Sequence, residues 1–195
     1  MTKCTVCGNE EDRCPHWFLA NSGRPVRPQN LNHEDMDPYS IGKALSKICR
    51  YNGHTKHHYS VAQHSVYVAN ILPEELKFCG LMHDATEVFC CDLIRPIKIT
   101  LPEYMELERG IWGKFCERFG LPEEMPKAVK WADNSVLMAE RWQLLPENVL
   151  PWGIPEPAAD IEIKEMSDKE AYNFWATEWN RLAVTQTGLD TIPFW

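Results

Sequence analysis

Two adjacent residues, His83 and Asp84, are the strongest sign of chemistry in this sequence, because they stand in the otherwise apolar segment 78–85. A charged side chain is seldom buried unless it is paired or binds a metal. Two further polar residues, His64 and Asp133, also stand in segments of apolar helical character. Imidazole and carboxylate groups of this kind are common ligands of divalent cations, so the four residues form one candidate site.

The apolar spacing around His64 and Asp133 predicts two helices that turn these side chains inward, since residues of one helix face recur at i, i+3, i+4 and i+7. The first face holds Val61, His64, Ser65, Val68, Ile71 and Leu72, and the second holds Val129, Ala132, Asp133, Val136, Leu137 and Glu140. Each polar residue could be a separately satisfied core group, but four together favour a shared cation. The mixed nitrogen and oxygen set suits Mn, Fe, Co, Ni or Zn.

Length and composition set limits on the class of protein. The chain has 195 residues, enough for one domain, and a formal net charge of −8, which argues against binding along a nucleic-acid backbone. We find no signal peptide and no apolar run near the roughly 18 residues of a membrane span. A cytoplasmic protein is therefore expected, with its eight Cys reduced or bound to metal.

Residues 1–16 are expected to form an appendage to a domain of residues 17–195. The appendage contains three Cys and one His that could close a small structural zinc knuckle, namely Cys4, Cys7, Cys14 and His16. The alternative is a reduced, disordered tail. The last two of these residues are closer together than zinc-binding pairs usually are, so the sequence leaves both interpretations open.

Helix start and stop signals predict an all-α fold. The expected helices cover about 38–50, the His64 segment up to Pro73, 73–91, 102–119, 126–144 and 168–182. Asp37 and Pro38 have the residue types of a helix cap and first turn. Residues 21–38 and 93–100 are expected to be loops, and the Pro-rich stretch 146–157 is expected to be non-helical.

The order of these residues resembles a known signature. His64, then His83-Asp84, then Asp133 is similar to the H…HD…D signature of the HD-domain metal-dependent phosphohydrolases. Segments 83–88 (HDATEV) and 92–98 (DLIRPIK) resemble the small bacterial 5′-deoxynucleotidases and their phage-encoded relatives, including dATP triphosphohydrolases. The resemblance covers about residues 17–145. It implies an HD-domain helical bundle, and it also implies a homo-oligomer.

The resemblance gives roles to the site residues. It implies that one divalent ion (Co, Mn, Zn, Fe or Mg) is bound by the four residues already found from their spacing, His64, His83, Asp84 and Asp133. Glu87 is expected on the same helix face as the HD pair and is predicted to be the general acid/base, the alternative being a solvent-facing Glu. Asp92 either helps to position water or a substrate hydroxyl, or caps the end of the helix.

Five residues are candidates for substrate binding. The resemblance makes Arg50 a phosphate contact, whereas its position alone suggests a favourable charge at a helix C-terminus. Lys98 is a second phosphate candidate, and His54 could add a donor nearby. Tyr51 and Trp17 could stack on a base, or belong to the core as most aromatic residues do.

The expected function is hydrolysis of a deoxynucleotide in the cytoplasm, or in the host cytoplasm if the chain is phage-encoded. The first expectation is a 5′-deoxynucleotidase that releases phosphate from deoxynucleoside monophosphates. The alternative enzyme is a dNTP triphosphohydrolase that prefers dATP. The non-enzyme alternative is a module that binds a nucleotide or nucleic acid and keeps a relic site. No membrane partner is expected.

Overall fold

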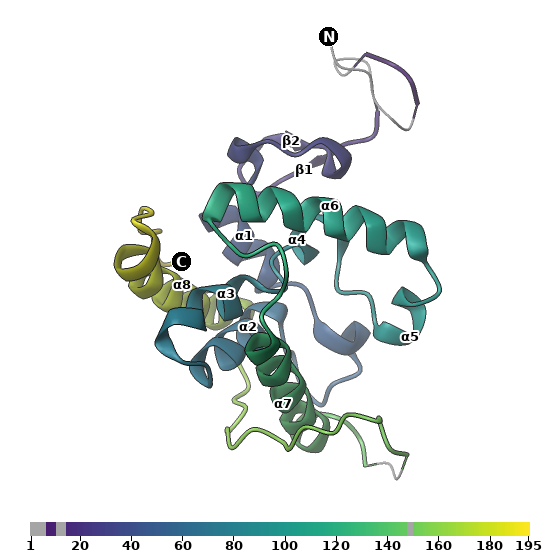
Figure 1. Cartoon of the computed structure of the whole chain (residues 1–195), viewed down its shortest axis with the longest axis vertical. Coiled ribbons are helices and arrows are strands. Elements are labelled where there is room, and N and C mark those ends of the chain that lie inside the picture. The colour runs from purple at the N-terminus through teal and green to yellow at the C-terminus, as the bar shows by residue number, and fades with distance from the viewer. Residues whose placement is uncertain (1–6, 11–14, 148–149) are drawn as a thin grey trace.

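The computed structural model describes residues 7–10, 15–147 and 150–195, which form a mostly helical fold with one short hairpin (Figure 1). The α-helices are α1 (Pro38–Leu45), α2 (Val61–Asn70), α3 (Lys77–Met82), α4 (Glu87–Cys90), α5 (Arg95–Lys98), α6 (Pro102–Phe119), α7 (Lys127–Leu144) and α8 (Asp168–Leu182). Short 3-10 turns are η2 (Pro28–Asn30), η3 (His33–Asp35), η4 (Arg50–Gly53) and η5 (Glu74–Leu76), and the π turn η6 (Ala183–Thr187) follows α8.

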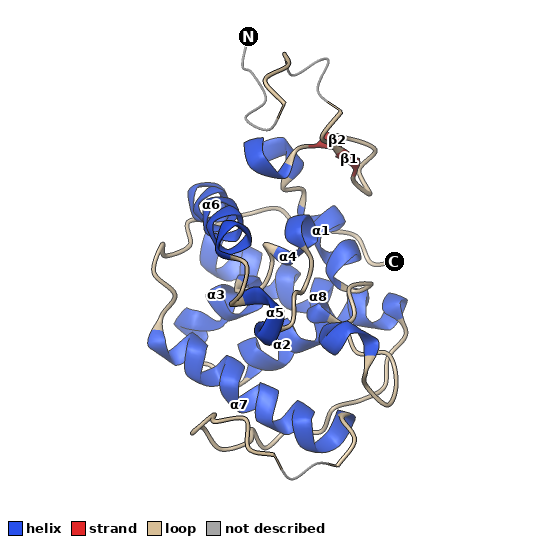
Figure 2. Cartoon of the chain, turned by 90° about the vertical axis from the view of Figure 1, so that its right-hand side faces the viewer, coloured by secondary structure: helices blue, strands red, loops and turns tan. Residues whose placement is uncertain are grey.

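Helix α2 is the centre of the fold. Every residue from Val61 to Ala69 is buried, and the helix packs against α3, α7 and α8 (Figure 2). A helix that is enclosed on all sides must satisfy its end groups internally. Ser60 does this at the N-terminus, where its hydroxyl accepts from the Gln63 N–H and the Gln63 side chain accepts from the Ser60 N–H.

The three long helices begin and end close to the predicted residues. Helix α6 ends at Gly120, whose φ of 67° only glycine adopts without strain. Helix α8 starts after Ser167, which forms a capping box with Glu170. On α8, the buried rings of Trp175 and Trp179 stack with centroids 5.4 Å apart and form part of the core.

The single helix predicted over residues 73–91 is wrong. The structure divides it into η5, α3 and α4, with a turn over residues 83–86. In this turn the N–H groups of Ala85 and Glu87 bond to carbonyls three residues back, those of Met82 and Asp84. Tighter turns of this kind inside a helical stretch often mark a functional site.

The helix predicted up to about residue 50 ends earlier, at Leu45. Its start is as predicted, because the Asp37 carboxylate caps the Ser40 N–H. The end is set by a tertiary contact: Cys49 is extended and forms a bridge with Ser60. Arg50 therefore begins a 3-10 turn and does not sit at a helix C-terminus, so the interpretation of its charge by the helix dipole is wrong.

Two segments predicted to be loops contain short elements. Strand β1 (Phe18–Leu19) lies just before the predicted loop 21–38 and pairs antiparallel with β2 (Pro25–Val26), which lies inside it. The second segment contains α5, which has Pro96 in its first turn, where a missing N–H costs nothing.

The predicted zinc knuckle falls partly outside the described residues, since Cys4 and Cys14 are not among them. Within residues 7–10, 15–147 and 150–195, no helix combines the length and the apolar character that crossing a membrane requires.

Candidate metal centre

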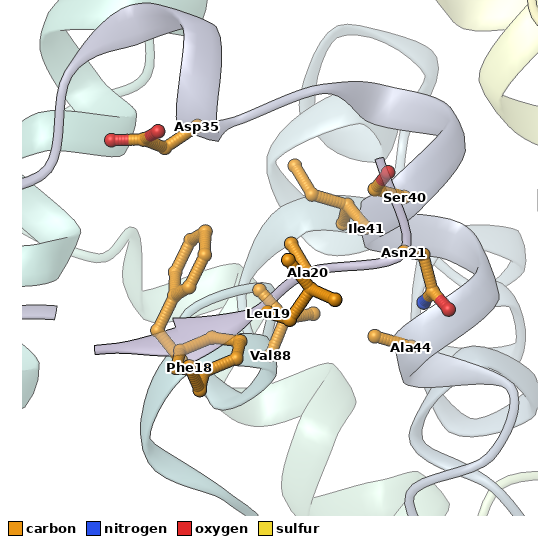
Figure 3. A pocket seen from close by; sticks show the side chains of 10 residues that line it. Phe18, Leu19, Ala20, Asn21, Asp35, Ser40, Ile41, Ala44 and Val88 are labelled. Carbon is orange, nitrogen blue, oxygen red and sulfur yellow. The ribbon is translucent and has the colours of Figure 1, made fainter. Parts of the chain in front are cut away.

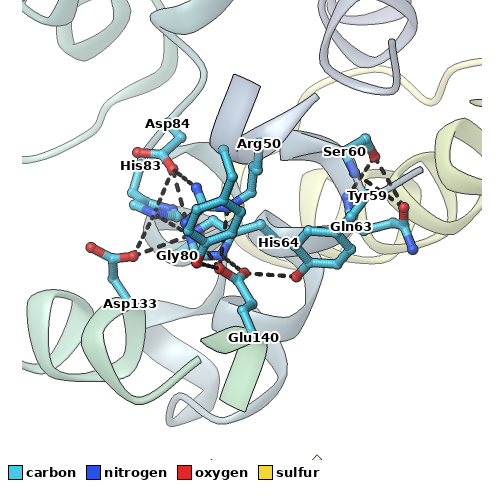
Figure 4. A network of polar contacts seen from close by, with 11 residues as sticks. Arg50, Tyr59, Ser60, Gln63, His64, Gly80, His83, Asp84, Asp133 and Glu140 are labelled. Carbon is cyan, nitrogen blue, oxygen red and sulfur yellow. Dashed lines mark hydrogen bonds and ion pairs between the residues drawn. The ribbon is translucent and has the colours of Figure 1, made fainter. Parts of the chain in front are cut away.

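Four side chains from three parts of the chain meet beside α2 (Figure 4). His64 extends from α2, His83 and Asp84 from the turn after α3, and Asp133 from α7. The Nε2 atoms of His64 and His83 are 3.3 Å apart. Asp133 Oδ1 lies 3.1 Å from His64 Nε2 and 3.9 Å from His83 Nε2. The two inward-facing stripes of the sequence therefore meet as predicted.

His64, His83 and Asp133 form a group that could hold a metal ion, because their ligand atoms all lie within 4.8 Å of one another. Asp84, the fourth predicted ligand, lies on the same side. Its Oδ2 is 3.2 Å from His83 Nε2 and 3.5 Å from His64 Nε2, and it also pairs with Arg50 at 3.4 Å. We call these four residues the His/Asp group.

The imidazoles have the orientation that a metal requires. The Nδ1 of His83 lies 2.8 Å from the Gly80 carbonyl, and the Nδ1 of His64 lies 2.6 Å from Glu140 Oε1. In the neutral ring, a carbonyl or carboxylate partner keeps the proton on Nδ1, so that Nε2 is the nitrogen available to a metal. The Nε2 atoms of both rings face Asp133, so the donor set fits a divalent ion.

The charge of the site also fits a divalent ion. Asp84, Asp133 and Glu140 carry three negative charges, and among the described residues the guanidinium of Arg50 pairs with two of them, Asp84 and Glu140. Buried carboxylates need compensation, and a dication would supply the missing two charges. The same negative charges act on the imidazole of His64. Burial and Arg50 lower the pKa of His64, but Glu140 and Asp133 outweigh them and raise it to about 9.

Glu140 contacts the His/Asp group, and the sequence analysis gave it no role. It is fully buried and bonds His64, Arg50, Tyr51 and Tyr59. Burial raises the pKa of Glu140, but Arg50 and His64 lower it to about 2. The signal was present, because Glu140 lies two helical turns after Asp133 on the same apolar stripe.

Glu87 and Asp92 lie near the group, and Glu87 is not solvent-facing. It is 6% exposed, and its Oε2 has no hydrogen-bond partner among the described residues. Burial, together with the negative charges of Asp84 and Asp92, raises the pKa of Glu87 well above its ordinary value. Burial also raises the pKa of Asp92, against the lowering effect of Arg50. Both carboxyls therefore hold a proton more readily than an ordinary carboxyl does, which is common at functional sites.

Of the five substrate candidates, Arg50, Tyr51 and Lys98 lie close to these carboxylates. Arg50 is buried and pairs with Asp84 and Glu140, and Tyr51 donates its hydroxyl to Glu140. Lys98 forms an ion pair with Glu108 at 2.6 Å. Burial lowers the pKa of Lys98, but Glu108, followed by Asp84 and Glu87, outweighs burial and raises it.

The structure shows no contact of Trp17 or His54 with the group among the described residues. In the described part of the chain neither makes a hydrogen bond or ion pair with it, and Trp17 is 49% exposed beside the hairpin. A separate cavity of about 110 Å³ lies between this hairpin, α1 and α4 (Figure 3). It is lined mainly by apolar side chains such as Phe18, Ile41 and Val88, and by none of the residues predicted to bind metal or substrate.

The fold and the site define a class: a mostly helical protein with a buried histidine at the centre of a group that could hold a metal ion. No family model matches the chain. It is 36% identical over 165 residues to the protein named "Uncharacterized protein YfdR" of Escherichia coli (strain K12), a match that covers 83% of this chain and 93% of that one.

A second relative is "Uncharacterized protein RCAP_rcc00048" of Rhodobacter capsulatus. It is 31% identical over 142 residues, which cover 66% of this chain and 72% of the relative. The chain belongs to the family of these two bacterial proteins. Their names state no activity, so an assignment of function depends on the site.

Proposed function

We propose that this protein is a metal-dependent phosphohydrolase of the HD-domain type that acts on deoxynucleotides and releases phosphate from deoxynucleoside monophosphates. The alternative within the same class is release of triphosphate from a dNTP. The observation that carries the proposal is the convergence of the Nε2 atoms of His64 and His83 on Asp133, with the buried carboxyl of Glu87 close by.

His64, His83, Asp84 and Asp133 would hold a divalent ion, and the ion would supply Lewis-acid chemistry for a phosphoryl oxygen and a water molecule. Glu87 takes the proton from the attacking water, a role that suits a buried carboxyl with a raised pKa. Arg50 neutralises charge on the phosphate through the donor edge that now faces Asp84. Lys98 adds positive potential from the α5 side, and Asp92 orients the water or a sugar hydroxyl.

The test is a product assay on the purified protein with Mn²⁺ or Co²⁺. Each dNMP, each dNTP and the matching ribonucleotides are incubated separately, and the products are resolved by ³¹P NMR. Inorganic phosphate from dNMPs supports the nucleotidase, and tripolyphosphate from dNTPs supports the alternative. The ribonucleotides show whether the sugar is recognised.

The matched control distinguishes hydrolysis at the His/Asp group from hydrolysis by contaminating phosphatases. The variant His83→Ala removes one imidazole of the group, whereas His33→Ala removes an exposed imidazole elsewhere. If His83→Ala loses turnover and His33→Ala keeps it, the activity belongs to the His/Asp group. A protein that binds one equivalent of metal but hydrolyses neither class of deoxynucleotide would contradict the proposal and favour a nucleotide-binding module.

A further inference from the structure

Glu140 uses its two carboxylate oxygens for different tasks. Oε1 lies 2.6 Å from His64 Nδ1 and accepts the Tyr59 hydroxyl at 2.8 Å. Oε2 accepts from Arg50, at 3.3 Å from Nε and 3.2 Å from Nη2, and from the Tyr51 hydroxyl. The Glu140 carboxylate therefore connects His64 of the His/Asp group with the buried guanidinium of Arg50.

On the imidazole side, Glu140 decides which nitrogen of His64 is available. A histidine binds a metal only through a nitrogen without a proton. Because the carboxylate accepts at Nδ1, the proton stays there and Nε2 faces Asp133 and His83. An anionic acceptor also makes the opposite nitrogen a stronger ligand than a neutral acceptor does.

On the guanidinium side, Glu140 decides where Arg50 points. It holds the edge formed by Nε and Nη2, so Nη1 is directed to Asp84 Oδ2, 3.4 Å away. That oxygen lies 3.2 Å from His83 Nε2. The edge of Arg50 that Glu140 does not hold therefore faces the same space as the imidazoles of His64 and His83.

The backbone is constrained to complete this arrangement. Tyr51 and Asn52 both adopt left-handed conformations, with φ of 55° and 51°. This conformation costs a non-glycine residue about 1–2 kcal/mol. Such outliers persist where the surroundings hold them, and they cluster at functional sites. Here the turn brings the Tyr51 hydroxyl onto Glu140.

We propose that Glu140 is a positioning residue that orients His64 for a divalent cation and Arg50 for a phosphate at the same time. The affinities for both ligands then depend on this one carboxylate. The phosphate half of the proposal rests on the proposed function, whereas the cation half rests on the geometry of the His/Asp group alone.

Calorimetric titration tests both halves without turnover. Mn²⁺ is titrated into the metal-free protein, and inorganic phosphate is then titrated into the Mn²⁺-loaded protein. We expect Glu140→Gln to weaken Mn²⁺ binding about 10–100-fold, the usual cost of losing a residue that holds a metal ligand. Phosphate binding should weaken as well. The control Glu74→Gln makes the same chemical change at the exposed ion pair with Arg181 and should alter neither affinity.

Folded Glu140→Gln protein that binds Mn²⁺ with the wild-type affinity would overturn the proposal. Weaker Mn²⁺ binding with unchanged phosphate binding would overturn the half that concerns Arg50. Circular dichroism establishes whether the variant is folded.

A spectroscopic readout decides the cation half even if the variant does not fold. In the Zn²⁺-loaded wild type, long-range ¹H–¹⁵N spectra should show the His64 ring protonated at Nδ1, with a proton that exchanges slowly. A proton on Nε2 would overturn the proposal. Wild-type protein that binds Mn²⁺ but hydrolyses no deoxynucleotide would remove the proposed function and the phosphate half that rests on it, and would leave the cation half standing. Wild-type protein that binds no Mn²⁺ would overturn both.

Discussion

The burial of Glu87 is unfavourable for folding, but the proposed function uses it. Its carboxyl is nearly sealed from solvent, and one of its oxygens has no hydrogen-bond partner in the described part of the chain. A buried polar group without a partner usually costs stability. Such a group beside a metal-binding arrangement is a candidate for proton transfer.

Replacing this carboxyl should stop turnover and spare the metal. We expect Glu87→Gln to lower kcat about 10²–10⁴-fold, the usual contribution of a general acid/base. Binding of Mn²⁺ should persist, because the Glu87 side chain is not one of the grouped ligands. Steady-state kinetics and calorimetry on the same preparation check the two parts. Full turnover in this variant would remove the assigned role of Glu87.

The same substitution should make the stability of the metal-free protein less dependent on pH. The folded pKa of Glu87 lies above its unfolded value, so its contribution is fully present below the unfolded pKa and is lost as pH rises. Near pH 4 the free energies of unfolding of wild type and Glu87→Gln should agree. Near pH 8 the variant should be the more stable. Urea denaturation in EDTA across this range measures the difference.

The control is a glutamate with the opposite shift. Lys114 lowers the pKa of the exposed Glu117, so Glu117→Gln should give no gain in stability at pH 8. An equal gain in both variants would mean that the protein responds to net charge and not to the buried carboxyl.

Among the elements, those with local signals could be predicted. Pro102 and Gly120 mark the ends of α6, and Ser167 marks the start of α8. Elements whose ends depend on residues far away in the sequence could not be predicted. The end of α1 depends on the Cys49–Ser60 bridge, and the break after α3 places the His83 ring on the Gly80 carbonyl.

The site residues also divide into those whose direction the sequence predicts and those whose role depends on distant partners. His64 and Asp133 could be predicted to point inward, because apolar neighbours at helical spacing define the face on which they lie. Glu140 shares the face with Asp133, but its role depends on Arg50 and Tyr59 from another segment. Spacing within a helix gives the direction of a side chain and does not identify the residue opposite it.

The packing of α1 against α8 depends on Gly42. A Cβ built there would lie 2.6 Å from the ring of Trp175, which cannot move easily because it is fully buried. We expect Gly42→Ala to destabilise the protein by about 1–3 kcal/mol, the usual cost of overpacking. The control Gly110→Ala lies in open space on α6 and should stabilise by up to about 1 kcal/mol. Thermal unfolding measures both, and an unchanged midpoint for Gly42→Ala would contradict this packing.

At the scale of the whole molecule, a metal ion would connect α2, the turn after α3 and α7. A ligand that binds only the folded state stabilises it, by about 2.7 kcal/mol at a concentration one hundred times its Kd. We expect Mn²⁺ to raise the Tm of the wild type and of Asp160→Asn, a change at an exposed site. Asp133→Asn should lose most of this rise. Equal rises in all three proteins would place the metal elsewhere.

The distance along the chain between these ligands also affects when the ion can be captured. His64 and Asp133 are separated by most of the helical core, and contacts of such long range form late because a large loop must close first. A nascent chain therefore has no complete binding group until α7 has left the ribosome. Uptake of the ion would mark the docking of α7 on α2, after local helices such as α6 have already formed.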